Sequence, residues 1–150
     1  MPYTLEINTR LTELKKIFAE NHQGFLTKES AQAFDKLVCV LDDRAVGYLG
    51  VYNRPDFMKQ EGYPVKFSPQ ESCIYIWTVV TSKEQQGKGV ATFLLENAKA
   101  RFMDKTLYAV VHIDNVRSIK VFERAGFKCI LSFQATQGGS GTHCLYAYKS

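Results

Sequence analysis

The sequence has no uninterrupted apolar run near the ~20 residues that a membrane-spanning helix needs, so we expect no transmembrane segment and no membrane partner. Its first ten residues, MPYTLEINTR, lack the basic and then apolar pattern of a secretory signal, which predicts a cytoplasmic protein. The net charge is +4 and Lys and Arg form no concentrated basic stripe, so no nucleic-acid partner is expected. What remains is a modest preference for anionic ligands.

Cysteine and histidine are also sparse, with four and three residues that are widely separated along the chain. No C-x-x-C pair and no His spacing fits a metal site, so the sequence predicts no metal and no disulfide scaffold. Each cysteine lies in an apolar, strand-like context, and we expect buried, reduced thiols. These cysteines are Cys39, Cys73, Cys129 and Cys144.

The chain length of 150 residues suits one domain, and we assign residues 1–150 to a single domain. An apolar hairpin is followed by strand–helix–strand–helix and then two strands, which implies a parallel crossover inside the sheet. The sequence therefore predicts an α/β fold with a mixed central sheet flanked by helices. Expected strands cover 3–8, 37–41, 45–53, 73–80, 105–113, 127–135 and 143–149, and expected helices cover 9–20, 27–37, 87–102 and 115–125.

Residues 54–70 hold three of the four prolines and show no periodicity, which predicts a long surface loop. Loops of this length are more often functional or interface-forming than idle. The aromatic residues Phe57, Tyr63 and Phe67 in this segment suit a substrate lid or a homodimer contact equally well.

The segment TSKEQQGKGV, residues 81–90, places two glycines where the expected strand 73–80 gives way to a helix. A helix N-terminus exposes unpaired amides and a partial positive charge, and glycine lets the backbone approach a ligand closely. This pattern suits a phosphate group held by main-chain amides. The segment matches neither a P-loop nor a G-x-G-x-x-G dinucleotide fingerprint, and a tight turn without a ligand explains the glycines equally well.

A second motif, DNVRSIKVFERAGF over residues 114–127, follows the next expected strand. Together the two segments resemble the signatures of the GNAT superfamily of acyl-CoA-dependent N-acetyltransferases. The resemblance extends over nearly the whole chain, because the expected order of strands and helices also agrees with the GNAT fold. The Q/R-x-x-G-x-G/A fingerprint is matched by Gln86, Gly89 and Ala91. The N-x-x-S-x-x-x-F/Y-x-x-x-G-F signature is matched by Asn115, Ser118, Phe122, Gly126 and Phe127.

The resemblance implies that acetyl-CoA is the cosubstrate and that main-chain amides at the loop and helix start bind its pyrophosphate. The pantetheine arm would pair with the exposed main chain at the end of the preceding strand, between two splayed parallel strands. Asn115 would contact the pantetheine or fix the loop beside it, although capping of the helix explains this residue equally well. The implied cofactor-binding residues are Val79, Val80, Thr81, Gln86, Gly87, Lys88, Gly89, Val90, Ala91, Thr92, Asn115, Ser118 and Phe122.

Three positions that carry catalytic groups in GNAT enzymes are altered in this sequence. Phe122 stands where many members place a Tyr acid, and Tyr75 and Val110 stand where members place a Glu base. A general acid or base contributes about 10²–10⁴-fold, so positioning alone still permits acetyl transfer. By strand alternation His112 shares the face of Val110 and suits a base near neutral pH, with a structural role as the alternative. Tyr75 suits a substrate contact or a proton relay, so His112 and Tyr75 are the candidate catalytic residues.

The predicted function is therefore transfer of the acetyl group of acetyl-CoA to a primary amine of a small molecule or a protein. The amine would attack the thioester directly, through a tetrahedral intermediate and without a metal. The alternative is a non-catalytic acyl-CoA-binding sensor or interaction module of the same fold, which the missing Tyr at Phe122 supports.

Overall fold

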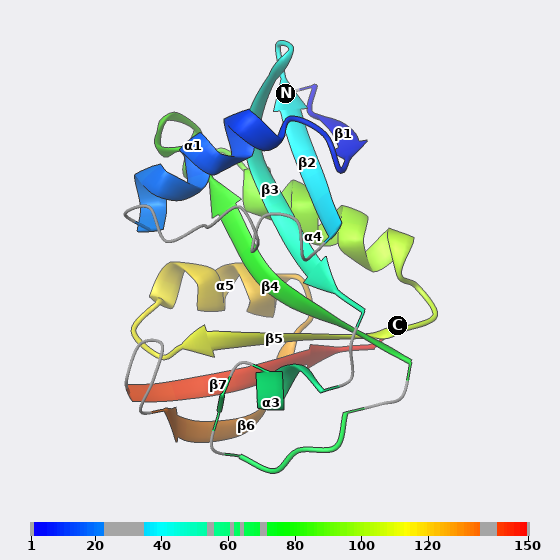
Figure 1. Ribbon diagram of the computed structural model, residues 1–150, viewed down its shortest axis with the longest axis vertical. Coiled ribbons are helices and arrows are strands. Elements are labelled where there is room, and N and C mark those ends of the chain that lie inside the picture. Colours follow the sequence, from blue (N-terminus) through cyan, green and yellow to red (C-terminus); the bar gives the residue numbers. More distant parts are fainter. Residues whose placement is uncertain are drawn as a thin grey trace. The chain divides into compact units, whose positions relative to one another are not determined.

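The computed structural model describes residues 2–22, 35–53, 56–60, 62–63, 65–69, 72–135 and 141–149. Its strands form one seven-stranded mixed sheet in the order β1-β2-β3-β4-β5-β7-β6, flanked by helices, which confirms the predicted fold class (Figure 1). In chain order the elements are β1 (Thr4–Ile7), α1 (Leu11–His22), β2 (Asp35–Leu41), β3 (Arg44–Tyr52), α3 (Phe57–Gln60), β4 (Cys73–Thr81), the 3₁₀ helix η1 (Lys83–Gln85), α4 (Val90–Arg101), β5 (Thr106–His112), α5 (Val116–Arg124), β6 (Lys128–Ala135) and β7 (Gly141–Tyr148).

Internal contacts divide the chain into two compact units. The first unit comprises Met1–Tyr52 and Trp77–Ala98, and the second comprises Asn53–Ile76 and Lys99–Ser150. Strand β4 contributes to both units, because its beginning belongs to the second and its end to the first. The assignment of residues 1–150 to one domain stays a prediction.

In the first unit, β2 and β3 form the predicted antiparallel hairpin, and β1 pairs with β2. Asp42 and Asp43 make the turn between the strands, with φ angles of 50° and 60°. Two consecutive left-handed residues are the geometry of a type I′ turn, whose twist matches that of the paired strands. Aspartate tolerates this conformation better than most residues, which is why a two-residue turn closes the hairpin here.

Helices α1 and α4 cover opposite faces of the β2–β3 hairpin (Figure 1). Ile17 and Phe18 of α1 join the buried cluster that contains Tyr48 of β3. The preceding residue, Gly47, faces the other side, where a Cβ would lie 2.6 Å from Cγ1 of Val90 at the start of α4. Because successive strand residues point to opposite faces, this one pair of neighbours places a helix on each side of the hairpin.

In the second unit, the beginning of β4 runs parallel to β5, with Cys73–Ile76 aligned to Thr106–Ala109. This pairing confirms the parallel strand–helix–strand crossover that the sequence predicts. Strand β5 then pairs with β7 in antiparallel fashion, and β7 pairs with β6.

Helices α3 and α5 lie on opposite faces of this second set of strands (Figure 1). Phe57 of α3 packs against Tyr108 of β5, with ring centroids 5.4 Å apart. Phe122 of α5 stacks near Tyr146 of β7, with centroids 6.3 Å apart. Tyr146 is opposite Ala109 in the sheet, so its side chain shares the face of Ala109 and lies opposite that of Tyr108.

The ends of α5 follow the sequence rules for helix termini. Asn115 is the N-cap, and its side chain accepts a hydrogen bond from the amide of Ser118. Gly126 follows the helix with a φ of 92°, the left-handed conformation expected of a glycine at this place. The ammonium group of Lys99 donates to the carbonyl of Ala125 at 2.8 Å, which satisfies one acceptor at the helix end.

The first two predicted helices differ from the observed elements. The helix predicted over 9–20 is α1, Leu11–His22, so Asn21 is helical although the sequence suggested a break there. The side chain of Asn21 donates to the carbonyl of Ile17, and the last turn is thereby closed. Of the helix predicted over 27–37, residues 27–34 lie outside the described residues and residues 35–37 belong to β2, so this part of the prediction is wrong.

The helix predicted to begin at residue 87 begins at Val90. Gly87 and Gly89 have φ angles of 78° and 85°, which a right-handed helix does not accommodate, so both residues belong to the turns before it. The short 3₁₀ helix η1, Lys83–Gln85, precedes them and was not predicted.

Two expectations about burial are also wrong. Within the segment predicted as a surface loop, Phe57 and Met58 of α3 are buried, because the short helix turns them inward. Cys129 is exposed, whereas the other three cysteines are buried as expected. Its strand, β6, is the last in the sheet order, and an edge strand leaves more of its residues accessible to solvent.

None of the helices among the described residues is long and apolar enough to cross a membrane. Across the same described part of the chain, His, Cys, Asp and Glu side chains form no group of three or more that could hold a metal ion.

Candidate active site

The loop between β4 and α4 is built around two left-handed glycines. Its first turn is closed by a hydrogen bond from the Gln85 amide to the Ser82 carbonyl at 3.0 Å. Gly87 and Gly89 then take positive φ, and a Cβ built on either would meet no heavy atom within 4 Å. Glycine is therefore required by the backbone conformation and not by close protein contact, and the space beside both residues is open.

The amides at the start of α4 have no acceptor in the part of the protein that the structure describes. The first bond of the helix runs from the Phe93 amide to the Gly89 carbonyl, which leaves the four preceding amides of Gly89–Thr92 unpaired. The Gly87 amide has no acceptor among the described residues either, whereas the Lys88 amide donates to the Gln85 carbonyl at 3.3 Å. Unpaired amides at a helix N-terminus carry a partial charge of about +0.5 and attract phosphate groups.

The rest of the loop is attached firmly to the first unit. The Ser82 amide donates to the Val46 carbonyl at 2.9 Å, next to the close approach of Gly47. On the other side, the hydroxyl of Tyr3 donates to the Lys88 carbonyl at 2.7 Å. Both lysines of the loop, Lys83 and Lys88, are exposed and add positive charge near the amides. The loop is thus held from behind while its amides stay accessible.

Gly47 is a positioning residue that the sequence analysis missed. A Cβ there would lie 2.7 Å from the Val80 carbonyl as well as 2.6 Å from Cγ1 of Val90. Only a glycine lets β3 approach both the end of β4 and the beginning of α4. An isolated glycine within a strand pattern signals such a close approach, so the signal was present in AVGYLGVY.

The end of β4 supplies main chain rather than side chains to the candidate site. Val80 is buried in the core of the first unit, so its isopropyl group is not available to a ligand. Val79 and Thr81, on either side of it, are half-buried. The structure therefore brings together Val79–Thr81 and Gln86–Thr92 in one unit, and their main-chain role in cofactor binding stays a prediction.

The remaining predicted cofactor residues lie in the second unit. Asn115 caps α5, with its Oδ1 atom 3.3 Å from the Ser118 amide, so the capping role is observed directly. Phe122 is buried, and its ring meets that of Phe127 edge-to-face at 5.1 Å. At the position of the usual Tyr acid, this chain thus has a core aromatic side chain without a transferable proton.

His112 is more constrained than its strand position suggests. Its Nδ1 atom accepts a hydrogen bond from the Asp114 amide at 3.0 Å, and a carboxylate oxygen of Asp114 lies 3.7 Å away. In the neutral ring the proton is therefore on Nε2, which faces Gly141 so closely that a Cβ there would be 2.8 Å away. His143 packs edge-to-face against the ring at 4.8 Å. A role as general base stays a prediction, and it requires the bond to the Asp114 amide to break.

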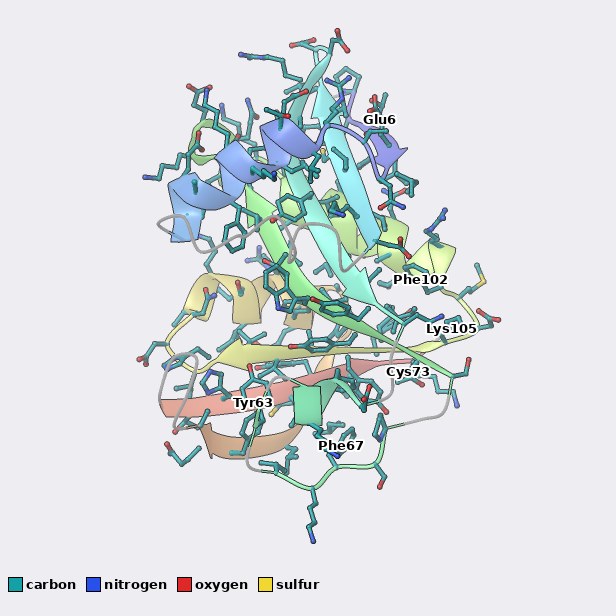
Figure 2. The ribbon with its side chains drawn as sticks, in the orientation of Figure 1. Glu6, Tyr63, Phe67, Cys73, Phe102 and Lys105 are labelled. Atoms are coloured by element: carbon teal, nitrogen blue, oxygen red, sulfur yellow. The ribbon has the colours of Figure 1, made fainter. Side chains whose placement is uncertain are left out.

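Tyr75 lies in an aromatic cluster of the second unit. Its ring stacks on Phe57 at 4.4 Å, and Phe57 in turn contacts Tyr108. Phe67 packs edge-to-face on Tyr108, with ring centroids 5.5 Å apart. Tyr63, labelled in Figure 2, follows α3 in the sequence. Its ring centroid lies 5.0 Å from that of Phe133 on β6. The aromatic residues of segment 54–70 are therefore packed within the second unit, and the role of Tyr75 in substrate contact stays a prediction.

Comparison with known proteins identifies a family and a shared fold. The model of the acetyltransferase (GNAT) family matches residues 6–127 of the chain. The fold resembles that of NAA60 from Arabidopsis thaliana in complex with acetyl-CoA, with 16% identity, a TM-score of 0.75 and coverage of 98% of this chain and 100% of that chain. A protein from Corynebacterium glutamicum, described as histone acetyltransferase HPA2 and related acetyltransferase, gives 21% identity, a TM-score of 0.73 and coverage of 99% and 96%.

An N-acetyltransferase from Staphylococcus aureus gives 15% identity, a TM-score of 0.71 and coverage of 99% of both chains. At these identities the structural likeness establishes the shared fold. A search of curated protein sequences found no match. The family model spans both motif segments and most of the elements described above, and the chain therefore belongs to the acetyltransferase (GNAT) family.

Proposed function

We propose that this protein is an N-acetyltransferase that uses acetyl-CoA to acetylate a primary amine of a small molecule or a protein. The observation that carries the proposal is the set of amides at Gly87 and Gly89–Thr92, which have no acceptor among the described residues. Family membership supports acetyl transfer as the reaction. The structure of NAA60 with acetyl-CoA, which shares this fold, supports acetyl-CoA as the cosubstrate.

In this proposal the diphosphate of acetyl-CoA is bound by the amides of Gly87 and Gly89–Thr92. Lys83 and Lys88 are exposed beside them and would contribute attraction that salt weakens. The main chain of Val79–Thr81 would pair with the amide groups of the pantetheine arm, as a strand end pairs with a peptide. Main-chain recognition of this kind depends on backbone geometry, which the positive φ angles of Gly87 and Gly89 set in this loop.

The proposed reaction can proceed without a dedicated side-chain acid. The neutral amine nitrogen attacks the thioester carbonyl, so a C–N bond forms and the carbonyl oxygen becomes an oxyanion. A main-chain amide near Val80 is our candidate donor to that oxyanion, a contact worth about 3–4 kcal/mol in other enzymes. The C–S bond then breaks, the nitrogen releases a proton to water or a base, and the thiolate accepts one. A thiol with a pKa of ~8.5 leaves tolerably well without a dedicated acid, which makes Phe122 compatible with catalysis.

A non-catalytic acyl-CoA-binding module is the second candidate function. Two observations favour it, the buried Phe122 at the usual position of the acid and the engaged Nδ1 atom of His112. Such a module would bind coenzyme A through the same amides but would release no thiol.

Thiol release in the presence of amines separates the two functions. The purified full chain is incubated with acetyl-CoA and a panel of small amines, lysine peptides and peptides with free N-termini, and free coenzyme A thiol is followed by absorbance. We expect at least one class of amine to accelerate thiol release well above hydrolysis. Mass spectrometry of the accelerated reaction then identifies an acetylated amine. If coenzyme A binds but no amine on the panel accelerates release, the binding module becomes the better account.

A further inference from the structure

We propose that Asn21 is a positioning residue that couples the last turn of α1 to acetyl-CoA affinity, by holding the β4–α4 loop in its binding conformation. The inference rests on the proposed function of that loop. It adds a residue that belongs to neither sequence motif and whose side chain contacts the segment before the unpaired amides.

The carboxamide of Asn21 makes three hydrogen bonds with three different segments. Its Nδ2 atom donates to the Ile17 carbonyl within α1 at 2.9 Å and to the Thr81 carbonyl at the end of β4 at 3.1 Å. Its Oδ1 atom accepts from Nε2 of Gln86 at 3.1 Å. Asparagine provides two N–H donors and one carbonyl acceptor on a short, planar group, and Asp, Ala and Leu do not.

The two loop contacts of Asn21 lie at either end of the segment that precedes the unpaired amides. Thr81 is the last residue of β4, and Gln86 immediately precedes Gly87. Because both ends of this short segment are held, the positions of the Gly87 and Gly89 amides that follow it are also restricted. A loop already held in its bound conformation loses less entropy when a ligand binds, so affinity should depend on these contacts.

The neighbouring residue of the same helical turn adds a weaker contact to the loop. A carboxylate oxygen of Glu20 accepts from the Lys83 amide at 3.5 Å. The last turn of α1 therefore contacts the loop at Thr81, Lys83 and Gln86. The bond from Asn21 to the Ile17 carbonyl is sufficient to close the last turn of α1. The bonds to Thr81 and Gln86 are therefore not needed for the helix itself.

Asn97 provides a matched control on another helix. Its Nδ2 atom donates to the Phe93 carbonyl four residues back at 2.8 Å, which is the same bond that Asn21 makes with Ile17. Both asparagines are half-buried. Within the described part of the chain Asn97 makes no hydrogen bond to the loop, so its replacement reports the cost of losing the helix bond alone.

The test compares Asn21→Ala, Asn21→Asp, Gln86→Ala, the double variant and Asn97→Ala in the full chain. Calorimetry measures the Kd for coenzyme A, steady-state assays measure the KM for acetyl-CoA, and thermal melting measures stability. We expect Asn21→Ala to raise the Kd and the KM about tenfold with kcat little changed, because it removes two hydrogen bonds to the loop segment and one such bond changes an equilibrium by up to about tenfold. Asn97→Ala should lower the melting temperature while leaving the Kd within about twofold, the precision of such a comparison.

Two further results would support the coupling. Asn21→Asp keeps the acceptor for Gln86 but loses both donors, so it should also raise the Kd. Gln86→Ala should weaken binding less in the Asn21→Ala background than in the native protein, because the bond between the two side chains is already absent.

A Kd for Asn21→Ala equal to that of Asn97→Ala would overturn the inference while leaving the proposed function intact. Absence of coenzyme A binding to the native chain would instead contradict the proposed function. Should Asn21→Ala fail to fold, hydrogen exchange on the native protein serves as the test. Coupling is reciprocal, so saturating coenzyme A should slow exchange at the amides of Ile17–Asn21, and unchanged exchange there would overturn the inference.

Discussion

At the residue scale, Arg10 shows how one side chain joins three pieces of backbone. Its guanidinium contacts carboxylate oxygens of Glu6 in β1 at 3.0 Å, Glu13 in α1 at 3.2 Å and Asp43 in the hairpin turn at 2.8 Å. Glu6 lies on β1, shortly before the chain enters α1 (Figure 2). The hydrogen bond from Arg10, followed by that from Thr9, lowers the pKa of the Glu6 carboxyl.

This lowered pKa predicts a particular pH dependence of stability. A carboxyl whose pKa is lower in the folded state stabilises the fold above its ordinary pKa, and that contribution is lost as the pH falls through the folded value. The difference in melting temperature between the native protein and Glu6→Gln should therefore be largest near neutral pH. It should shrink as the pH falls below ~4.3, the ordinary value for glutamate.

Thermal melting of both proteins between about pH 7 and pH 3 checks the prediction. This range brackets the ordinary pKa of glutamate. Glu84→Gln, which removes one exposed carboxylate of η1, is the control for the loss of a negative charge elsewhere in the first unit. A difference for Glu6→Gln that stays constant over the whole range would contradict the assigned role of the ion pair.

At the element scale, local backbone rules predicted helix ends and turns better than long-range contacts. The cap at Asn115 and the left-handed glycine at Gly126 could be predicted because each rule involves residues only a few positions apart. The contact between Asn21 and Gln86 spans 65 positions, and no pattern of sequence marks it. The predicted end of α1 was wrong for the same reason, since Asn21 is stabilised as a helical residue partly by the distant Thr81 carbonyl.

The close approach of β3 to the cofactor loop gives a prediction at this scale. Gly47→Ala would place a methyl group 2.6 Å from Cγ1 of Val90 and 2.7 Å from the Val80 carbonyl. We expect a loss of about 1–3 kcal/mol in the free energy of unfolding, as for other overpacked cores. Weaker coenzyme A binding should accompany this loss, because the start of α4 must shift. Chemical denaturation and calorimetry measure the two effects.

A second substitution tests whether the contact with Val90 causes the loss of stability in Gly47→Ala. Val90→Ala removes one of the two close atoms, so the variant Gly47→Ala with Val90→Ala should lose less stability than the sum of the single variants. The Val80 carbonyl cannot be removed in this way, so recovery should be partial. Strictly additive losses would mean that the contact with Val90 is not what excludes a side chain at Gly47.

At the scale of the whole molecule, the sequence motifs lie in different units and belong to one family fold. The fingerprint around Gln86 and Gly89 is in the first unit, and the signature that begins at Asn115 is in the second. Both could be found in the sequence because each combines a strand end, a helix start and residues of special backbone geometry. Side chains that would recognise an acceptor could not be identified, because the sequence has no local pattern that marks them.

The central claim at this scale is that the amides of Gly87 and Gly89–Thr92 bind the diphosphate of acetyl-CoA. Gly89→Ala and Gly89→Glu both place a side chain on a residue with a φ of 85°, so both should lose about 1–2 kcal/mol of stability. The space beside Gly89 is open, so neither variant creates a steric clash within the protein. Only the glutamate adds a negative charge beside the proposed phosphate site.

Calorimetric titration of the native protein and these two variants with coenzyme A is therefore the most direct test. The account predicts that the native protein and Gly89→Ala bind coenzyme A, while Gly89→Glu loses binding although it melts at the same temperature as Gly89→Ala. Equal affinity for coenzyme A in Gly89→Glu and Gly89→Ala would contradict it.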